Sequence, residues 1–547
     1  MRTVFKLSNI IYFYQKFSAL EQKLFIISIC LGLVGLFGLL GNLYFAATIP
    51  VPVYGGHLRE GIVGRPTNLN PIMPAENDAD RDLRALIHSG LIGLDQEGNF
   101  RPQLAESLPD VSEDLKTYTI KLRKNLRWQD GKPITADDVL YTIASAQSKE
   151  TGMLRFSYKF VQTEKLDDYT VRFELREPSA NFSENLLIGL LPVHLSQSYD
   201  NLRPIGAGAY KIKKIKYKNS REIIAVELVA NEFYYPHRPF LNRITLKFFN
   251  TSEELETAYR NRDIESFGKT ADHKNINLRF GDFLQSIKQP QYQAVLFNTD
   301  KSEILKSLRV RQALRLATDK QAVIEKIFDN NASLVGAPVV GHISVPPSEY
   351  SPEKAGDLLG QDGWQTNADG LRYKNNKPLR IVLATSDILV NIKTAYLLRE
   401  QWRKVGTDLE IRTYNQQDFF EKALRPREYE AVLIFENSGH DADPYYFWHS
   451  SQVADPGLNF AILRSNEVDK TIVEARETRD AEKRKILYQK FISLVNAESP
   501  GVFLAQPHYL YVTTGIQNIN ISGLSLSHER FANVHEWFVK SGRKFDF

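Results

Sequence analysis

The stretch of the sequence richest in groups that could bind a ligand is residues 436–450 (ENSGHDADPYYFWHS). It combines carboxylates, imidazoles and aromatic rings within one short segment. A carboxylate removed from water favours an ammonium partner, and aromatic faces hold apolar or planar groups. This composition indicates a binding site for an organic ligand. The other interpretation is a turn, in which Asp441 and Asp443 cap a helix that begins near Pro444 and the aromatic side chains pack in a core.

Motifs that would indicate an enzyme are incomplete. Residues 267–270 (FGKT) end like a phosphate-binding loop, but the glycine needed five residues before Gly268 is Asp263. The pairs His528-Glu529 and His535-Glu536 each begin a zinc-protease motif, yet positions 532 and 539 are alanine and valine. We therefore expect no catalytic residues, no cofactor and no resident metal, and we expect that the protein is not an enzyme.

The elements that would position residues 436–450 alternate between helix and strand. A strand is predicted at 429–436, after a strand at 409–413 and a helix at 416–424. Thr318 and Gln321 have the spacing of a capping box for the helix that follows. Crossover helices that cover a sheet give an α/β fold, in which ligands bind after the C-terminal ends of strands.

The first half of the chain shows strand alternation instead. Residues 118–122 and 170–175 predict strands, and 210–218 (YKIKKIKYK) predicts a β-hairpin arm with lysines on its solvent face. The neighbouring carboxylates Asp137 and Asp138 are explained by a capping box, because Thr135 stands three residues before Asp138.

An uncharged apolar run covers residues 25–47. As a helix it would be about 35 Å long, enough for a hydrocarbon core of about 30 Å. Basic residues dominate the segment before it, which predicts a cytoplasmic N-terminus and an extracytoplasmic remainder. We expect a leader (1–24), a single-pass transmembrane helix (25–47) and a linker (48–55). A cleaved signal peptide is the alternative, although Phe45 suits a cleavage site poorly.

Composition excludes several classes of function. The formal net charge of the 547 residues is +4, and much of it lies in the leader, so we expect no nucleic-acid partner. Cys30, within the apolar run, is the single cysteine, which excludes an intramolecular disulfide and a thiol catalyst outside the membrane. We expect a monomer.

Six motifs in order resemble bacterial extracellular solute-binding proteins of family 5, the peptide- and nickel-binding components of ABC importers. They lie at 56–71, 86–91, 102–107, 118–139 (YTIKLR, then WQDGKPITADDV), 204–211 (PIGAGAYK) and 297–319. The resemblance runs from about residue 55 to about residue 540.

The resemblance implies a two-lobed α/β fold of the large periplasmic-binding type, with an extra domain in the first lobe, behind the N-terminal helix. The first lobe would combine residues 56–95, 205–295 and 506–547. Residues 96–204 would form the inserted domain and residues 296–505 the second lobe. The ligand would be enclosed between the lobes by hinge closure.

In peptide-binding members an aspartate just after a second-lobe strand holds the α-amino group of the peptide. The resemblance places His440 at that position and Asp441 one residue later, while Glu436 or Asn437 replaces the usual tryptophan. It also implies a backbone contact at Val63 and an aromatic contact at Tyr158. The predicted ligand-binding residues are therefore Asn437, His440, Asp441, Asp443, Tyr446, Trp448, Val63 and Tyr158.

The function that these observations imply is capture of oligopeptides and their delivery to ABC permease subunits at the cell membrane. Two alternatives stay open. The ligand could be a metal chelate, haem or a glycan, with His440, Asp441 and His449 as candidate metal ligands. The chain could also be a transport-inactive sensor or scaffold with the same fold.

Overall fold

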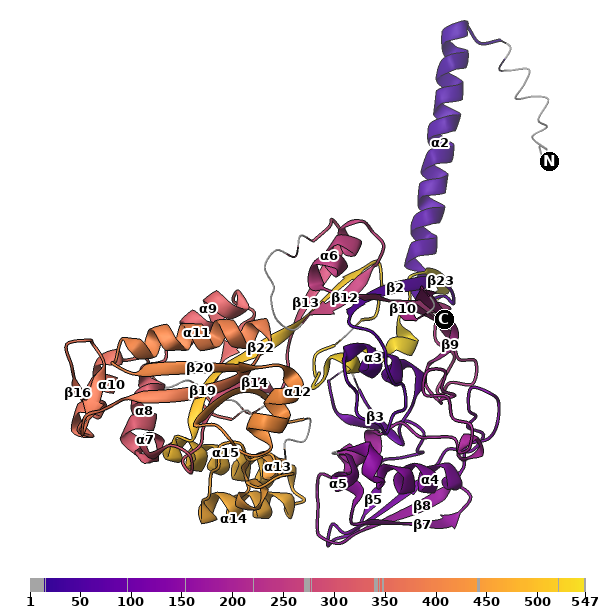
Figure 1. The fold of residues 1–547 in the computed structure, drawn as a ribbon. Coiled ribbons are helices and arrows are strands. Elements are labelled where there is room, and N and C mark those ends of the chain that lie inside the picture. Colours follow the sequence, from indigo (N-terminus) through magenta and orange to yellow (C-terminus); the bar gives the residue numbers. More distant parts are fainter. Residues whose placement is uncertain are drawn as a thin grey trace.

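The computed structural model describes residues 14, 16–95, 97–152, 154–219, 221–269, 276, 278–338, 343, 345–346, 349–439, 443–519 and 521–545. It has two lobes side by side, and the N-terminal helix projects from the first (Figure 1). The two-lobed α/β fold expected from the sequence is confirmed.

The projecting helix, α2 (Ala19–Ala46), begins with the capping box of Ser18 and Glu21. None of its residues is buried, and it is long and apolar enough to cross a membrane. The next residues do not form a free linker. Strand β1 (Thr48–Pro52) pairs with the C-terminal strand β23 (Ser541–Phe545), and Arg543 Nη2 donates to the Phe45 carbonyl at 2.9 Å. The C-terminal end of the apolar helix is thus tied to the first lobe.

The first lobe is built on one end of a large mixed sheet, in the order β9-β10-β11-β2-β12-β22. The predicted hairpin forms, and the central strand β2 runs parallel to both of its neighbours. Helices α3 (Asp78–Ile87) and α6 (Ser252–Arg260) pack beside β2. The strands are β2 (His57–Val63), β9 (Tyr210–Lys218), β10 (Glu222–Ala230), β11 (Arg243–Phe249), β12 (Ser266–Lys269) and β13 (Asp282–Lys288).

A smaller domain within the first lobe holds a four-stranded antiparallel sheet, with its own buried core around Trp128. The predicted capping box opens its main helix, since the Thr135 amide donates to Asp138 Oδ2 at 2.9 Å. The elements are β3 (Ile92–Leu94), β4 (Phe100–Pro102), β5 (Asp110–Val111), β6 (Thr117–Lys121), α4 (Ala136–Ala146), α5 (Leu154–Tyr158), β7 (Val161–Asp167) and β8 (Thr170–Leu175), with short helices η1 (Lys149–Thr151), η2 (Phe182–Leu187) and η3 (Val193–Leu195).

The second lobe is built on the order β20-β19-β21-β14-β22, with a hydrophobic cluster on each face. Its strands are β14 (Gln291–Phe297), β15 (Ala332–Leu334), β19 (Arg380–Ser386), β20 (Asp408–Tyr414) and β21 (Ala431–Asn437), beside a small sheet of β16 (Gln365–Thr366), β17 (Arg372–Lys374) and β18 (Lys377–Pro378). Its helices are α7 (Glu303–Lys306), α8 (Leu308–Leu316), α9 (Lys320–Phe328), α10 (Pro352–Gln361), α11 (Leu389–Arg403), α12 (Gln416–Asp418), η4 (Phe419–Leu424), α13 (Tyr445–Trp448), η5 (Ser450–Gln452), α14 (Asn466–Arg476) and α15 (Ala481–Glu498).

The long strand β22 (Gly501–Thr514) joins the lobes. Its first part pairs with β14 in the second lobe, and residues 508–514 pair with β13 in the first. The chain then returns to the first lobe through η6 (Ser527–Phe531) and η7 (Val534–Glu536). Because β14 pairs with β21 along its whole length, residues 291–295 lie in the sheet of the second lobe, not in the first lobe where they were expected.

Candidate ligand-binding cleft

The loop after β21 leaves the second lobe at its contact with the first. Asn437, the last residue of β21, donates from Nδ2 to the Ser525 carbonyl of the first lobe at 2.8 Å. Its Oδ1 accepts from the Gly439 amide at 2.9 Å, which turns the chain. Asn437 therefore bridges the lobes at the point from which the loop begins. His440 and Asp441 lie outside the described residues.

Asp443 is occupied by an internal ion pair. Its Oδ2 lies 2.9 Å from Arg476 Nε, and its Oδ1 accepts from the Tyr445 amide at 3.0 Å. Burial raises the pKa of Asp443, and Arg476 opposes that rise. The guanidinium of Arg476 also lies 4.4 Å from the centre of the Tyr445 ring. This carboxylate accepts from the first amide of the short helix α13, whose N-cap residue is Pro444, so for Asp443 the structure favours the turn interpretation.

The two aromatic candidates on α13 have different environments. Tyr446 is 38 % exposed, so part of its side chain is open to solvent. Trp448 is only 2 % exposed, and its indole Nε1 donates to Glu436 Oε1 at 3.1 Å. The Tyr292 hydroxyl donates to the same oxygen. Trp448 therefore packs in the core of the second lobe and presents no surface to the cleft in this conformation.

We expect Glu436→Gln to stabilise the protein at pH 8 and to leave its stability unchanged at pH 5. Burial raises the pKa of Glu436 from 4.5 to about 7, against the hydrogen bonds from Tyr292 and Trp448. The native state therefore holds more protons than the unfolded chain between these values, so stability falls as pH rises through that window. The cost at pH 8 is about 3 kcal/mol. Glutamine keeps the acceptor oxygen and removes the titration.

Thermal unfolding at the two pH values measures this effect. Glu474→Gln, on the exposed face of α14, is the matched control and should show no difference at either pH. Equal unfolding midpoints for wild type and Glu436→Gln at pH 8 would show that Glu436 is readily ionised in the folded protein.

Tyr158 lies in the core of the small domain. It is buried, and its hydroxyl donates to the Asn185 carbonyl. The surface that this domain turns toward the second lobe comes from neighbouring residues instead. The Ala180 amide donates to the Arg476 carbonyl at 3.0 Å, and Asn181 Nδ2 lies 3.5 Å from the Tyr488 hydroxyl. The small domain and the second lobe are therefore in contact beside the Asp443–Arg476 pair.

Val63 lies in the first lobe, at the C-terminal end of β2. It is 39 % exposed and lines a cavity of about 200 Å³ between β2, α3, α6 and η6. Sequence reasoning did not identify the charged residues of this cavity, Asp78, Asp82, Glu256 and Arg530.

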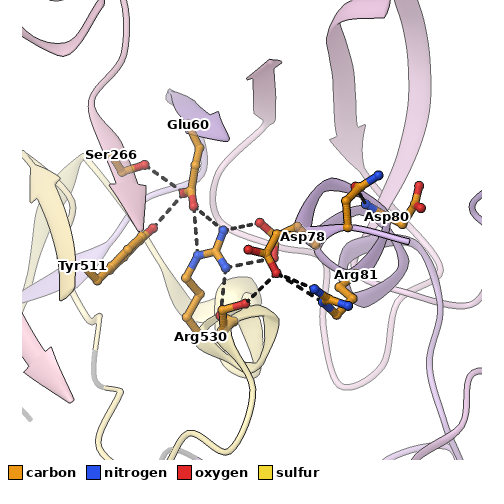
Figure 2. A network of polar contacts seen from close by, with 10 residues as sticks. Glu60, Asp78, Asp80, Arg81, Ser266, Tyr511 and Arg530 are labelled. Carbon is orange, nitrogen blue, oxygen red and sulfur yellow. Dashed lines mark hydrogen bonds and ion pairs between the residues drawn. The ribbon is translucent and has the colours of Figure 1, made fainter. Parts of the chain in front are cut away.

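Figure 2 shows the buried network behind this cavity. Arg530 is held between two carboxylates: its Nε donates to Glu60 Oε1 at 2.9 Å and its Nη1 to Asp82 Oδ1 at 2.9 Å. The other oxygen of Glu60 accepts from the Tyr511 hydroxyl at 2.7 Å and from Ser266 Oγ at 2.8 Å. All five side chains are buried. The network connects the C-terminal segment (residues 515–545), through Arg530 of η6, to Glu60 of β2 and Asp82 of α3.

The described residues contain no group of three His, Cys, Asp or Glu side chains that could hold a metal ion. The two lobes share strand β22, and the end of β21 in the second lobe contacts Ser525 of the first, which is the architecture of a two-lobed solute-binding protein. The chain belongs to the bacterial extracellular solute-binding proteins, family 5, because the model of that family's middle region matches residues 99–456.

Relatives of this chain bind different ligands, as their names state. The oligopeptide-binding protein AppA of Bacillus subtilis is 28 % identical over 514 residues, which cover 89 % of this chain and 92 % of AppA. The structure of AppA with a nonapeptide superposes with a TM-score of 0.72 over 90 % of this chain and all of that one, at 26 % identity. NikZ from Campylobacter jejuni in complex with Ni(L-His) has a TM-score of 0.74 at 27 % identity, and covers 88 % of this chain and 99 % of NikZ. Heme-binding protein A of Haemophilus influenzae is 25 % identical, and the match covers 74 % of this chain and 79 % of that protein.

Proposed function

We propose that the protein is a membrane-anchored extracytoplasmic receptor that captures oligopeptides between its lobes and delivers them to an ABC import permease. The observation that carries this proposal is the match to AppA along nearly the full length of both chains, together with the nonapeptide in the AppA structure. The loop after β21 supplies the ligand groups of the second lobe, and the end of β2 supplies those of the first.

The anchor is α2, whose apolar surface is exposed along its whole length. The pairing of β1 with β23 leaves little free chain between this helix and the first lobe, so the receptor stays close to the bilayer. Such an arrangement suits a receptor that meets permease subunits in the same membrane.

Thermal unfolding of the full-length protein in detergent micelles tests the choice of ligand. A mixture of peptides of four to nine residues is expected to raise the unfolding midpoint, because a ligand that binds only the folded state stabilises it by mass action. Nickel with L-histidine, and haemin, are the comparison ligands. If either of these ligands raised the unfolding midpoint and peptides did not, the ligand of the receptor would be a metal chelate or haem and not an oligopeptide.

A further inference from the structure

The cavity beside Val63 has no ligand role in the account given so far. Its wall comes from the C-terminal end of β2, from β12 and β22, from the N-terminal halves of α3 and α6, and from η6. Ser527 lines it, and two residues earlier the Ser525 carbonyl accepts the Asn437 hydrogen bond from the second lobe. The cavity therefore lies beside the contact between the lobes. Its volume of about 200 Å³ is below the roughly 300–1,000 Å³ of a pocket for a whole drug-sized ligand, so it suits one chemical group of a larger ligand.

The charge around the cavity is unbalanced. The single guanidinium group of Arg530 forms ion pairs with two buried carboxylates, Glu60 and Asp82, so this network has an excess of one negative charge when both are ionised. Asp78 and Glu256 also line the cavity, but Asp78 is paired with Arg81 Nη2 at 2.9 Å and neither is counted in this excess. Burial, together with smaller contributions from the negative charges of Asp78 and Glu60, raises the pKa of Asp82 to about 6, and Arg530 opposes this rise. A cation placed in the cavity would relieve this excess.

Tyr509 provides an independent observation. It is 2 % exposed and lines the cavity, yet its hydroxyl makes no hydrogen bond to another residue in the described part of the chain. Its neighbour Tyr511 is stacked on it, with ring centres 6.4 Å apart, and donates to Glu60. Gly268 leaves room for the free hydroxyl, because a Cβ there would lie 1.7 Å from it. The hydroxyl faces the cavity, so a ligand group that accepts or donates there would gain a hydrogen bond.

We propose that this cavity is a cation subsite of the first lobe that binds one ammonium or guanidinium group of a captured peptide. Asp82 supplies the carboxylate, which can accept more hydrogen bonds than the two from Arg530, and Tyr509 supplies a hydroxyl oxygen and an aromatic face. The inference rests on the proposed peptide function and adds a preference for a basic side chain. The subsite lies in the first lobe, so it is separate from the loop after β21 in the second lobe, where Asp443 is already paired with Arg476.

Calorimetric titration of the full-length protein in detergent tests the subsite. The probes are alanine nonapeptides that carry a single lysine, or the uncharged norleucine, at each position in turn. We expect lysine at one position to bind at least tenfold more tightly than norleucine. Asp82→Asn should reduce this preference to less than threefold while affinity for the norleucine peptide is kept. Tyr509→Phe, which retains the ring, should reduce it by about threefold. Asp137→Asn, an exposed carboxylate in the small domain, is the matched control.

The outcomes separate the two proposals. If peptides bind without a lysine preference, or with one that Asp82→Asn and Tyr509→Phe both leave intact, the subsite is refuted and the receptor function stands. If no peptide binds, the receptor function fails and the subsite fails with it. N-acetylated probes identify which cation the cavity binds. If the preference for lysine persists after acetylation, the cavity binds the lysine side chain. If acetylation instead weakens binding in wild type but not in Asp82→Asn, the cavity binds the α-ammonium group.

Discussion

Arg530→Met is expected to destabilise the first lobe by about 3–5 kcal/mol, because removing one partner of a buried ion pair leaves uncompensated charge in the interior. Glu60 and Asp82 would both lose their cation, and the methionine would leave five guanidinium hydrogen bonds unmade, four to these carboxylates and one to the Ser527 carbonyl. The effect should be seen as a lower urea midpoint by circular dichroism. Hydrogen exchange in β2, which carries Glu60, should become faster.

Two further variants separate the charge effect from a packing effect. Arg380→Met removes an exposed arginine that pairs with Asp408 at 2.7 Å, and should cost less than about 1 kcal/mol. The combination of Arg530→Met with Glu60→Gln and Asp82→Asn removes the buried charges together and should recover most of the lost stability. A single Arg530→Met variant as stable as Arg380→Met would refute the idea that the network holds the C-terminal segment to β2.

The second large effect is expected at Asp441. Because Asp443 is paired with Arg476, we propose that Asp441, the other aspartate of the segment between β21 and α13, holds the α-amino group of a peptide. Asp441→Asn should weaken binding of a free-amine nonapeptide by about 2–5 kcal/mol, the range for truncating one partner of a desolvated charge pair. This is a loss of roughly 30-fold or more. Calorimetric titration measures it.

His440→Ala is the matched variant, since His440 occupies the position at which the resemblance to family 5 implies an aspartate. We expect it to weaken binding much less than Asp441→Asn, because an imidazole does not supply the negative charge that an ammonium group favours. N-acetylation of the peptide should abolish the difference between Asp441→Asn and wild type. Unchanged affinity in both variants would place the amine site elsewhere.

Local sequence patterns predicted much of the fold. The capping box of Thr135 and Asp138 and the hairpin of β9 and β10 form as expected, because each depends on residues close together in the chain. The capping box at Thr318 was wrong. Asp319 caps α9 instead, through a hydrogen bond from the Ala322 amide, while Thr318 accepts from the Trp402 indole. Asp319, the next residue, is a stronger N-cap residue than threonine and takes the N-cap position of α9. The Thr318 hydroxyl makes a tertiary hydrogen bond with Trp402 instead.

Less of the candidate site than of the fold could be predicted from the sequence. The pattern of residues 436–450 does not show which aromatic ring is available to a ligand. Trp448 packs in the core, where its indole donates a hydrogen bond to the buried carboxylate of Glu436. The network of Arg530 leaves no local signal, since Glu60 and Asp82 lie 470 and 448 residues away in the chain. Glu60 also sits within a strand, where a charged residue is usually assigned to the solvent face.

The measurement that tests the central claim most directly is native mass spectrometry of the full-length protein, released from detergent after purification without denaturation. If the protein is an oligopeptide receptor, it should carry a heterogeneous set of bound masses that match short peptides and disappear on unfolding. A single non-peptide mass, or a protein that carries no ligand and shows no thermal shift with peptide mixtures, would contradict that account.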